Sequence, residues 1–242
     1  GIQTGNRDAL SLDWPQNRVA RLNIREFDEN TVPLLDTLLS TVSQNADALI
    51  IDLRNCIGGS SRYGDTLATR ILDRDYLLTG CSRYRVNNGY GRAQGNYRKE
   101  YEAFFQDRAY AVEPSDTIRI NRSNVLKCPV VILIGGKTVS AAETFLVRIY
   151  ELPERPLLIG QRTSGSTGAP LVIDLPHGAC VRICTRCQLF PLSGKPFVNE
   201  GISPDIEIAL TVEDYFTGHD RILELAILLL NNCGGHTACL TN

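Results

Sequence analysis

The chain has 242 residues, of which 43% are hydrophobic and 21% are charged, a composition that fits one large α/β domain and excludes a disordered or collagen-like chain. Its 25 Lys and Arg residues are balanced by 27 Asp and Glu residues, which argues against non-specific binding to nucleic acid, since that binding needs clustered positive charge. The apolar runs are far shorter than the ~20 residues that cross a bilayer. We therefore expect no membrane span.

The first half of the chain has the pattern of a strand, a helix and a second strand. Residues 18–24 alternate apolar and polar side chains, which predicts a strand, and a capped helix with Pro33 in its first turn follows. Residues 48–53 are almost continuously apolar, as expected of a strand buried on both faces of a parallel sheet. A glycine-rich loop at residues 58–61 leads from this strand into a predicted helix at about residues 62–72.

The same order of elements recurs in the second half. Residues 129–134 predict a buried strand, residues 135–139 a turn, and Ser140 the start of a helix, before a third buried strand at residues 157–160. Two such units in series predict a mostly parallel sheet with right-handed crossovers. We expect the strands at residues 48–53, 129–134 and 157–160 to be neighbours in that sheet.

The remaining segments are predicted to surround this core. Residues 87–126 carry many aromatic side chains without a sustained period, and we interpret them as an elaboration lying over the core. Turn chemistry at Pro176-His177-Gly178 predicts a hairpin between residues 171–175 and 179–189. Two helices are expected near the end, at residues 211–217 and 220–230, the second of them capped near Cys233-Gly234.

The eight cysteines are too few per residue for a disulfide scaffold. Cys184 and Cys187 form a C-x-x-C pair, and residues 233–239 offer two thiols and the imidazole of His236, so a zinc site is conceivable. However, the stretch around Cys184 reads as a strand, in which Cys184 and Cys187 would point to opposite faces. We therefore expect buried, small apolar cysteines, with no metal and no cofactor.

Three loops at the carboxyl ends of the predicted strands are the places where α/β folds bind ligands, and they span residues 54–61, 135–140 and 161–168. Ser140 would stand at a helix N-terminus, where free N–H groups and the helix dipole favour a developing oxyanion. The alternative is a capping box, because Glu143 follows three residues after Ser140. Spacing alone favours the capping box.

Four sequence blocks change that balance, namely Asp52–Ser60, Thr138–Glu143, Gly160–Gly165 and Glu200–Ile206. In this order they resemble the signature blocks of the tail-specific (C-terminal processing) serine protease family, over about residues 18–230. The resemblance implies a crotonase-like and Clp-protease-like core of repeated ββα units, in a single domain spanning residues 1–242. It also implies a serine peptidase that cleaves extended or unfolded polypeptides near their C-termini.

The resemblance assigns roles to individual residues. Ser140 matches the nucleophile, and Gly58, Gly59 and the backbone N–H of Ala141 match the oxyanion-hole region. A serine hydroxyl also needs a general base at neutral pH. In the processing-protease branch this base is a lysine after the third block, but residues 165–168 contain none. The expected dyad is therefore incomplete.

A second branch, which resembles the tricorn core, uses a histidine from the first strand and a glutamate before the last block. Glu200 matches the glutamate, whereas Asn23 stands where the histidine is expected. We interpret the three histidines, His177, His219 and His236, as surface imidazoles. Lys137 and Lys195 are the nearest cationic alternatives, although either would need burial to act as a base. Asp205 more simply marks the entry to a strand than a metal or catalytic acid.

Two functions are compatible with this pattern. The first is a serine endopeptidase with Ser140 as nucleophile, acting on a polypeptide, and the second is a catalytically impaired, peptide-binding relative with the same fold. Acyl-ester or acyl-CoA chemistry on the crotonase-like fold is a third and weaker option. The family resemblance implies an extracytoplasmic location, periplasmic or secreted. Residues 1–5 show no signal peptide, no PDZ module is recognisable, and the lack of any methionine suggests a mature or trimmed piece of a longer product.

Overall fold

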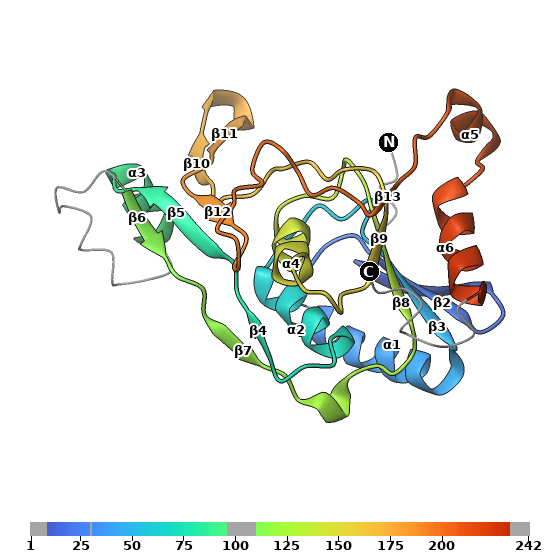
Figure 1. Cartoon of the computed structure of the whole chain (residues 1–242). Coiled ribbons are helices and arrows are strands. Elements are labelled where there is room, and N and C mark those ends of the chain that lie inside the picture. The colour runs from blue at the N-terminus through green and yellow to red at the C-terminus, as the bar shows by residue number, and fades with distance from the viewer. Residues whose placement is uncertain (1–8, 30, 96–109, 233–242) are drawn as a thin grey trace.

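The apolar strands assemble into a six-stranded sheet in the order β1-β2-β3-β8-β9-β13. Figure 1 shows this sheet in a computed structural model, which describes residues 9–29, 31–95 and 110–232. Its strands are β1 (Leu10–Gln16), β2 (Val19–Ile24), β3 (Ala48–Asp52), β8 (Val130–Ile134), β9 (Leu157–Gly160) and β13 (Ile206–Glu207). β1 is antiparallel to β2, and all other neighbours are parallel. The mixed α/β fold with a mostly parallel sheet is confirmed, as is the adjacency of β3, β8 and β9.

Helices cover both faces of this sheet (Figure 1). One face carries α1 (Thr31–Asn45), α2 (Ser61–Ile71) and α4 (Ala141–Ile149), and the other carries α6 (Arg221–Asn232). β3 shows why both faces must be covered, since Leu49 packs into the core with the three helices and Ile50 into the core with α6. Side chains alternate along a strand, so an apolar run buries both faces.

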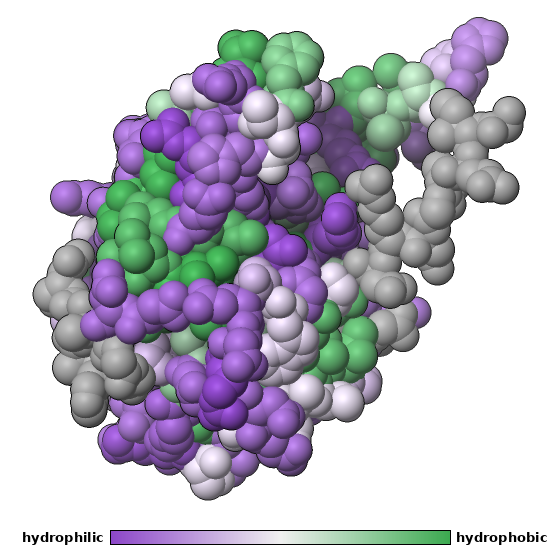
Figure 2. Space-filling view, turned by 90° about the vertical axis from the view of Figure 1, so that its right-hand side faces the viewer, coloured by the Kyte–Doolittle hydropathy of each residue, from purple (hydrophilic) through white to green (hydrophobic). Residues whose placement is uncertain are grey.

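The α6 side of the molecule keeps apolar surface. α5 (Val212–Thr217) begins with a capping box at Thr211, and α6 leaves the side chain of Leu228 55% exposed. Figure 2 looks onto this side and shows apolar patches among hydrophilic side chains. Both predicted C-terminal helices are confirmed, although the expected cap at Cys233-Gly234 lies outside the described residues. Within the described ranges, every helix is too short or too polar to cross a membrane.

Residues 76–95 and 110–126 form an arm at the side of the sheet (Figure 1), and Leu77, Ile120 and Val125 of this arm pack into the core with α1, α2 and α4. In the elaboration predicted at residues 87–126, Ile120 and Val125 thus contact the core, while residues 96–109 lie outside the described residues. Its elements are β4 (Tyr76–Leu78), β5 (Cys81–Arg85), α3 (Asn88–Gly95), β6 (Tyr110–Glu113), β7 (Thr117–Arg119) and the 3-10 helix η2 (Arg122–Asn124). β4 pairs with β7, while β5 pairs with β6 and with β12 (Cys187–Leu189). These pairings satisfy the backbone N–H and C=O groups between the strands of the arm.

The predicted hairpin is present, but its second strand is shorter than expected. β10 (Leu171–Asp174) pairs antiparallel with β11 (Cys180–Ile183) around the 3-10 helix η3 (Pro176–Gly178). The second strand ends at Ile183 because Thr185 turns back, its Oγ1 donating to the carbonyl of Ala169 at 2.6 Å. The chain then continues as β12, alongside β5.

The cysteines differ in their surroundings. Cys56 is buried, as expected, whereas Cys180 and Cys184 are exposed, because β11 lies outside the core and ends before Cys184. The prediction of buried cysteines is therefore wrong for these two residues. The structure gathers no group of three or more His, Cys, Asp or Glu side chains suited to a metal within the ranges that it describes. Residues 233–239 lie outside those ranges.

Candidate active site

Ser140 lies at the junction between β8 and α4 in a backbone conformation that is rare for serine, with φ 57° and ψ −120°. Its side chain makes no capping hydrogen bond to the helix, so the capping-box interpretation is wrong. The N–H of Ser140 instead donates to the carbonyl of Ser166 at 2.9 Å. A non-glycine residue with positive φ is strained and persists only where its surroundings hold it in place.

The loop after β3 approaches this serine closely. A Cβ atom built on Gly58, which has φ +98°, would lie 2.6 Å from Cβ of Ser140 and 3.0 Å from the backbone nitrogen of Ala141. Phe27 fixes the loop, since its N–H donates to the carbonyl of Gly58 at 2.7 Å and its carbonyl accepts from Ser60 at 2.8 Å. The structure thus brings Ser140, Gly58 and Ala141 together at the carboxyl end of the sheet.

Gly59 and Gly58 differ in their surroundings. A Cβ atom on Gly59, which has φ +117°, would collide with the backbone carbonyl of Phe27 rather than with the serine. The N–H of Gly58 faces the thiol of Cys56, whose pKa burial raises to about 11. Gly58 therefore provides space beside Ser140, while Gly59 holds the loop against Phe27, in the segment that follows β2.

Glu143 is fully buried and anchors the third loop. Its carboxylate accepts hydrogen bonds from Oγ1 of Thr163 at 2.6 Å, from the N–H of Gly165 at 2.6 Å and from the N–H of Ser166 at 2.8 Å. Burial raises the pKa of Glu143, and these hydrogen bonds act in the opposite direction without cancelling the rise. Glu143 therefore holds the loop whose Ser166 carbonyl bonds Ser140. An acidic residue in an apolar helix turn was the sequence signal for this role.

The fourth block joins the same cluster through its backbone. The N–H of Thr163 donates to the carbonyl of Ile202 at 3.0 Å, and the N–H of Ile202 donates to Oγ1 of Thr163 at 2.7 Å. A Cβ atom on Gly165 would lie 3.0 Å from the nitrogen of Glu200. All four blocks thus converge, but the side chain of Glu200 is exposed, and its role toward Ser140 stays a prediction.

The alternative bases have other surroundings. Asn23 donates to Asp13 at 2.9 Å, and Lys137, Lys195 and His177 are exposed, as expected for solvated residues. His219 is also exposed and lies 2.8 Å from Glu224, and this hydrogen bond raises its pKa. His236 lies outside the described residues.

An ion-pair cluster around Arg54, next to the glycine loop, was not predicted. Arg54 bonds Asp52 at 2.7 Å and Asp220, just before α6, at 2.7 and 2.9 Å. Burial favours a lower pKa for Arg54, but the two carboxylates outweigh it and raise the pKa. This cluster ties the end of β3 to the start of α6. Asp52 and Arg54 stand in the first block, but no local pattern predicts Asp220 as the partner of Arg54.

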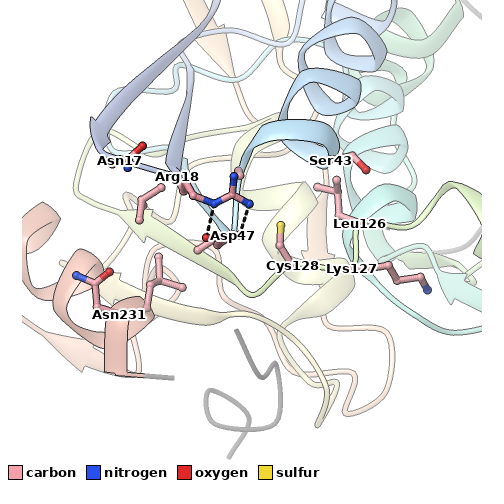
Figure 3. Close-up of a pocket in the computed structure, with 12 residues that line it drawn as sticks. Asn17, Arg18, Ser43, Asp47, Leu126, Lys127, Cys128 and Asn231 are labelled. Carbon is pink, nitrogen blue, oxygen red and sulfur yellow. Dashed lines mark hydrogen bonds and ion pairs between the residues drawn. The ribbon is translucent and has the colours of Figure 1, made fainter. Parts of the chain in front are cut away.

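A pocket of about 520 Å³ lies at the opposite, amino end of the sheet (Figure 3). Arg18 and Asp47 form an ion pair at 2.5 Å on its wall, and Cys128 contributes a thiol whose pKa burial raises to about 11.

Asp205 also lies at the amino end of the sheet, where its carboxylate accepts from Arg155 at 2.6 and 2.7 Å and from the N–H of Leu158 at 2.8 Å. Asp205 thus marks a strand entry, as predicted.

Comparison with known proteins gives this geometry a family. A strained serine between glycine-rich loops, on a mostly parallel sheet, is an arrangement of α/β hydrolytic enzymes. Residues 18–208 match the model of Peptidase family S41, and the chain belongs to this family.

Individual relatives agree with this assignment. The carboxyl-terminal-processing protease of Picosynechococcus sp. is 24% identical over 190 residues, which is 78% of this chain and 38% of that protein. A crystal structure from Parabacteroides merdae has 25% identity and a TM-score of 0.69, covering 95% of this chain and 67% of that one. Mature CPAF, at 21% identity and a TM-score of 0.65, covers 90% of this chain and 53% of its own, and it shows a shared fold. The chain thus spans less than two fifths of the processing proteases that it matches.

Proposed function

We propose that the chain is a serine endopeptidase of the tail-specific type, which cleaves extended or unfolded polypeptides near their C-termini with Ser140 as nucleophile. The observation that carries this proposal is the backbone of Ser140, at φ 57° and ψ −120°, against Gly58 and Ala141. Such a conformation costs on the order of 1 to 3 kcal/mol, and strain of this kind clusters at active sites. Membership of the S41 family and the processing-protease relatives support the same activity.

The proposed reaction uses the carboxyl end of the sheet. Oγ of Ser140 attacks the carbonyl carbon of the scissile peptide, and the resulting oxyanion binds the N–H groups of Gly59 and Ala141, the latter at the start of α4. A general base takes the hydroxyl proton and returns it to the leaving amine as the C–N bond breaks, and a water molecule then hydrolyses the acyl-serine and restores Ser140. Glu200 orients a neighbouring group or a water molecule, since a carboxylate is a poor base for a serine hydroxyl.

The second candidate is a peptide-binding relative of the same fold with impaired catalysis. It is favoured by Asn23, which occupies the predicted histidine position and donates to Asp13, and by the absence of lysine from residues 165–168. The two candidates differ in one respect only, which is whether Ser140 reacts.

A fluorophosphonate probe distinguishes them. We expect the probe to label the unmodified chain and not the Ser140→Ala variant, whereas Ser60→Ala, a change in the neighbouring exposed loop, should leave labelling intact. Mass spectrometry of cleaved unfolded proteins then locates the cuts, which should lie near C-termini. Binding of C-terminal peptides without labelling or turnover would instead establish the impaired relative.

The location is a separate proposal. On the family resemblance, we propose that the chain acts outside the cytoplasm, in the periplasm or after secretion. Fractionation of the source cells, with detection by an antibody, tests this, and recovery of the chain from the cytoplasmic fraction alone would contradict it.

A further inference from the structure

The β10–β11 hairpin has one face made of aliphatic side chains. Its register pairs Leu171 with Ile183 and Ile173 with Val181, and directly paired residues of two strands lie on the same face. We call this set the aliphatic face. The opposite face has a different character, because Val172 pairs with Arg182 and Asp174 with Cys180.

Three of the four residues of the aliphatic face are open to solvent, while the fourth, Leu171, is half-buried beside α3. Ile173 is 42% exposed, Val181 41% and Ile183 48%. A two-stranded hairpin has little stability alone in water, and contiguous exposed apolar surface marks interaction sites. The hairpin projects from the molecule above β12 (Figure 1). These features are those of a surface that is completed by a partner.

The edges of the hairpin specify what kind of partner fits. Within the described ranges, β10 and β11 pair only with each other, so their outer edges present backbone N–H and C=O groups. An extended polypeptide satisfies such an edge through its own backbone, and its alternate side chains reach one face of the resulting sheet. The combination therefore suits an extended chain with apolar residues at every second position.

The hairpin is also continuous with the candidate active site. The loop that bears Ser166, whose carbonyl accepts from Ser140, runs within a few residues into β10. On the return side, the thiol of Cys184 donates to the carbonyl of Thr167 at 3.3 Å. The base of the hairpin is thereby fixed to the loop whose Ser166 carbonyl accepts from Ser140, and a polypeptide lying along the hairpin reaches this loop at the base.

The geometry points to the aliphatic face as the docking surface of the polypeptide substrate, which binds extended along the hairpin with alternating apolar side chains. This inference rests on the proposed function, because it names the substrate class of the same site. It makes Val181 and Ile183 specificity-determining residues outside the reacting group. Val172, on the opposite face, has no part in it.

Binding is measured on the Ser140→Ala variant, so that no cleavage occurs, by fluorescence anisotropy of a labelled peptide of alternating Val and Ser residues. Adding Val181→Thr and Ile183→Thr together should weaken binding about tenfold, because two apolar side chains that the bound peptide covers become polar. Adding Val172→Thr is the matched control, since it makes the same change at a valine that is 50% exposed. It should alter binding less than about twofold.

Several outcomes would overturn the inference. One is equal binding of the peptide by the double variant and by Val172→Thr, and another is no binding of the peptide by the Ser140→Ala variant itself. A third is self-association in sedimentation that the double variant abolishes and Val172→Thr does not, because a second copy of the chain would then be the occupant. Circular dichroism checks that the variants are folded, and Ile173→Thr, on the same face, replaces the Val181 or Ile183 substitution if the double variant is not. Fluorophosphonate labelling of Ser140 is independent of this binding, so failure of the proposed function and failure of the inference are separately visible.

Discussion

The two ends of the central sheet differ in how they use the same strands. At the carboxyl end, three loops converge on Ser140, whose backbone is strained, and a buried carboxylate, Glu143, holds one of them. At the amino end there is a pocket of about 520 Å³ with an exposed ion pair between Arg18 and Asp47 on its wall. Volume alone therefore does not identify the site, because the carboxyl end is marked by convergent loops and strain rather than by the size of a hollow.

The largest expected effect is that of Ser140→Gly, which tests the carboxyl end directly. Turnover should fall by at least about 10⁴-fold, as for loss of a catalytic serine. The free energy of unfolding should nevertheless rise by about 1 kcal/mol, because glycine adopts φ 57° without strain. Chemical denaturation and a peptide-cleavage assay measure both quantities. Ser60→Gly is the control, because Ser60 has an ordinary φ of −88°, and this variant should not become more stable. Unchanged turnover in Ser140→Gly would show that Ser140 is not the nucleophile.

The next effect separates the two glycines. Gly58→Val should lower turnover about 10² to 10³-fold, because its side chain crowds Ser140 and the oxyanion position. Gly59→Val should lose the fold as well, because its side chain meets the backbone of Phe27. Melting curves distinguish the two variants. Normal turnover in Gly58→Val would contradict the oxyanion assignment.

An amino-end variant should change stability without changing the chemistry. Asp205→Asn leaves the guanidinium of Arg155, 13% exposed, without its charged partner and should lower the free energy of unfolding by about 2 kcal/mol. Burial alone would raise the pKa of Asp205, but Arg155 and the Leu158 N–H lower it. Because the folded pKa lies below the unfolded value of about 3.9, the stabilisation is complete above that pH and is lost as the pH falls through the folded pKa.

The pH dependence supplies the check on this variant. Denaturation curves between neutral and strongly acidic pH should show a steeper loss of stability in the parent than in Asp205→Asn. The kcat of the folded variant should match that of the parent. Equal acid sensitivity of the two proteins would show that the Arg155 pair does not control this part of the curve.

A smaller effect is expected from Glu200→Gln, which asks how far the site extends. If Glu200 orients a group at Ser140, turnover should fall about tenfold while stability stays within about 1 kcal/mol, since the side chain is exposed. Steady-state kinetics and melting curves measure these effects. A fully active variant, or an experimental structure with the carboxylate more than about 10 Å from the Ser140 hydroxyl, would reduce the site to the serine and its glycine loop.

The smallest effect is expected at the pocket. Arg18→Gln removes an ion pair whose two side chains are more than half exposed, and such pairs contribute little in water. Melting temperature and turnover should both equal those of the parent. A clear loss of turnover would show that the amino end of the sheet takes part in function as well as the carboxyl end.

Much of the fold could be predicted from the sequence because its signals are local. The almost continuous apolar runs at residues 48–53 and 130–134 require burial on both faces, and this alone indicates a parallel sheet. The direction of the arm could not be predicted, because it depends on the pairing of β5 with β12, about a hundred residues later in the chain. The end of β11 likewise depends on a bond between Thr185 and Ala169, which periodicity does not record.

Part of the candidate site could be predicted from the sequence for a similar reason. Ser140, Gly58 and Gly59 carry local signals, namely a helix start and a double glycine after a strand. Glu143 was interpreted as a capping residue because spacing cannot show that its carboxylate turns toward Gly165 and Ser166. A sequence describes which residues can bond, whereas the choice among partners is made by the tertiary fold.

The wide separation of the site segments along the chain has a consequence for biosynthesis. Gly58, Ser140 and Ser166 meet only after β3, β8 and β9 have paired, and such contacts between distant residues form slowly, because large loops must close first. During synthesis, the glycine loop emerges from the ribosome long before the loop at residues 161–168. A nascent chain that lacks this last loop holds Ser140 without its Ser166 contact, and we expect it to be inert. Any reactivity of the serine is thus delayed until the sheet is assembled, so an unfinished chain does not act on its neighbours.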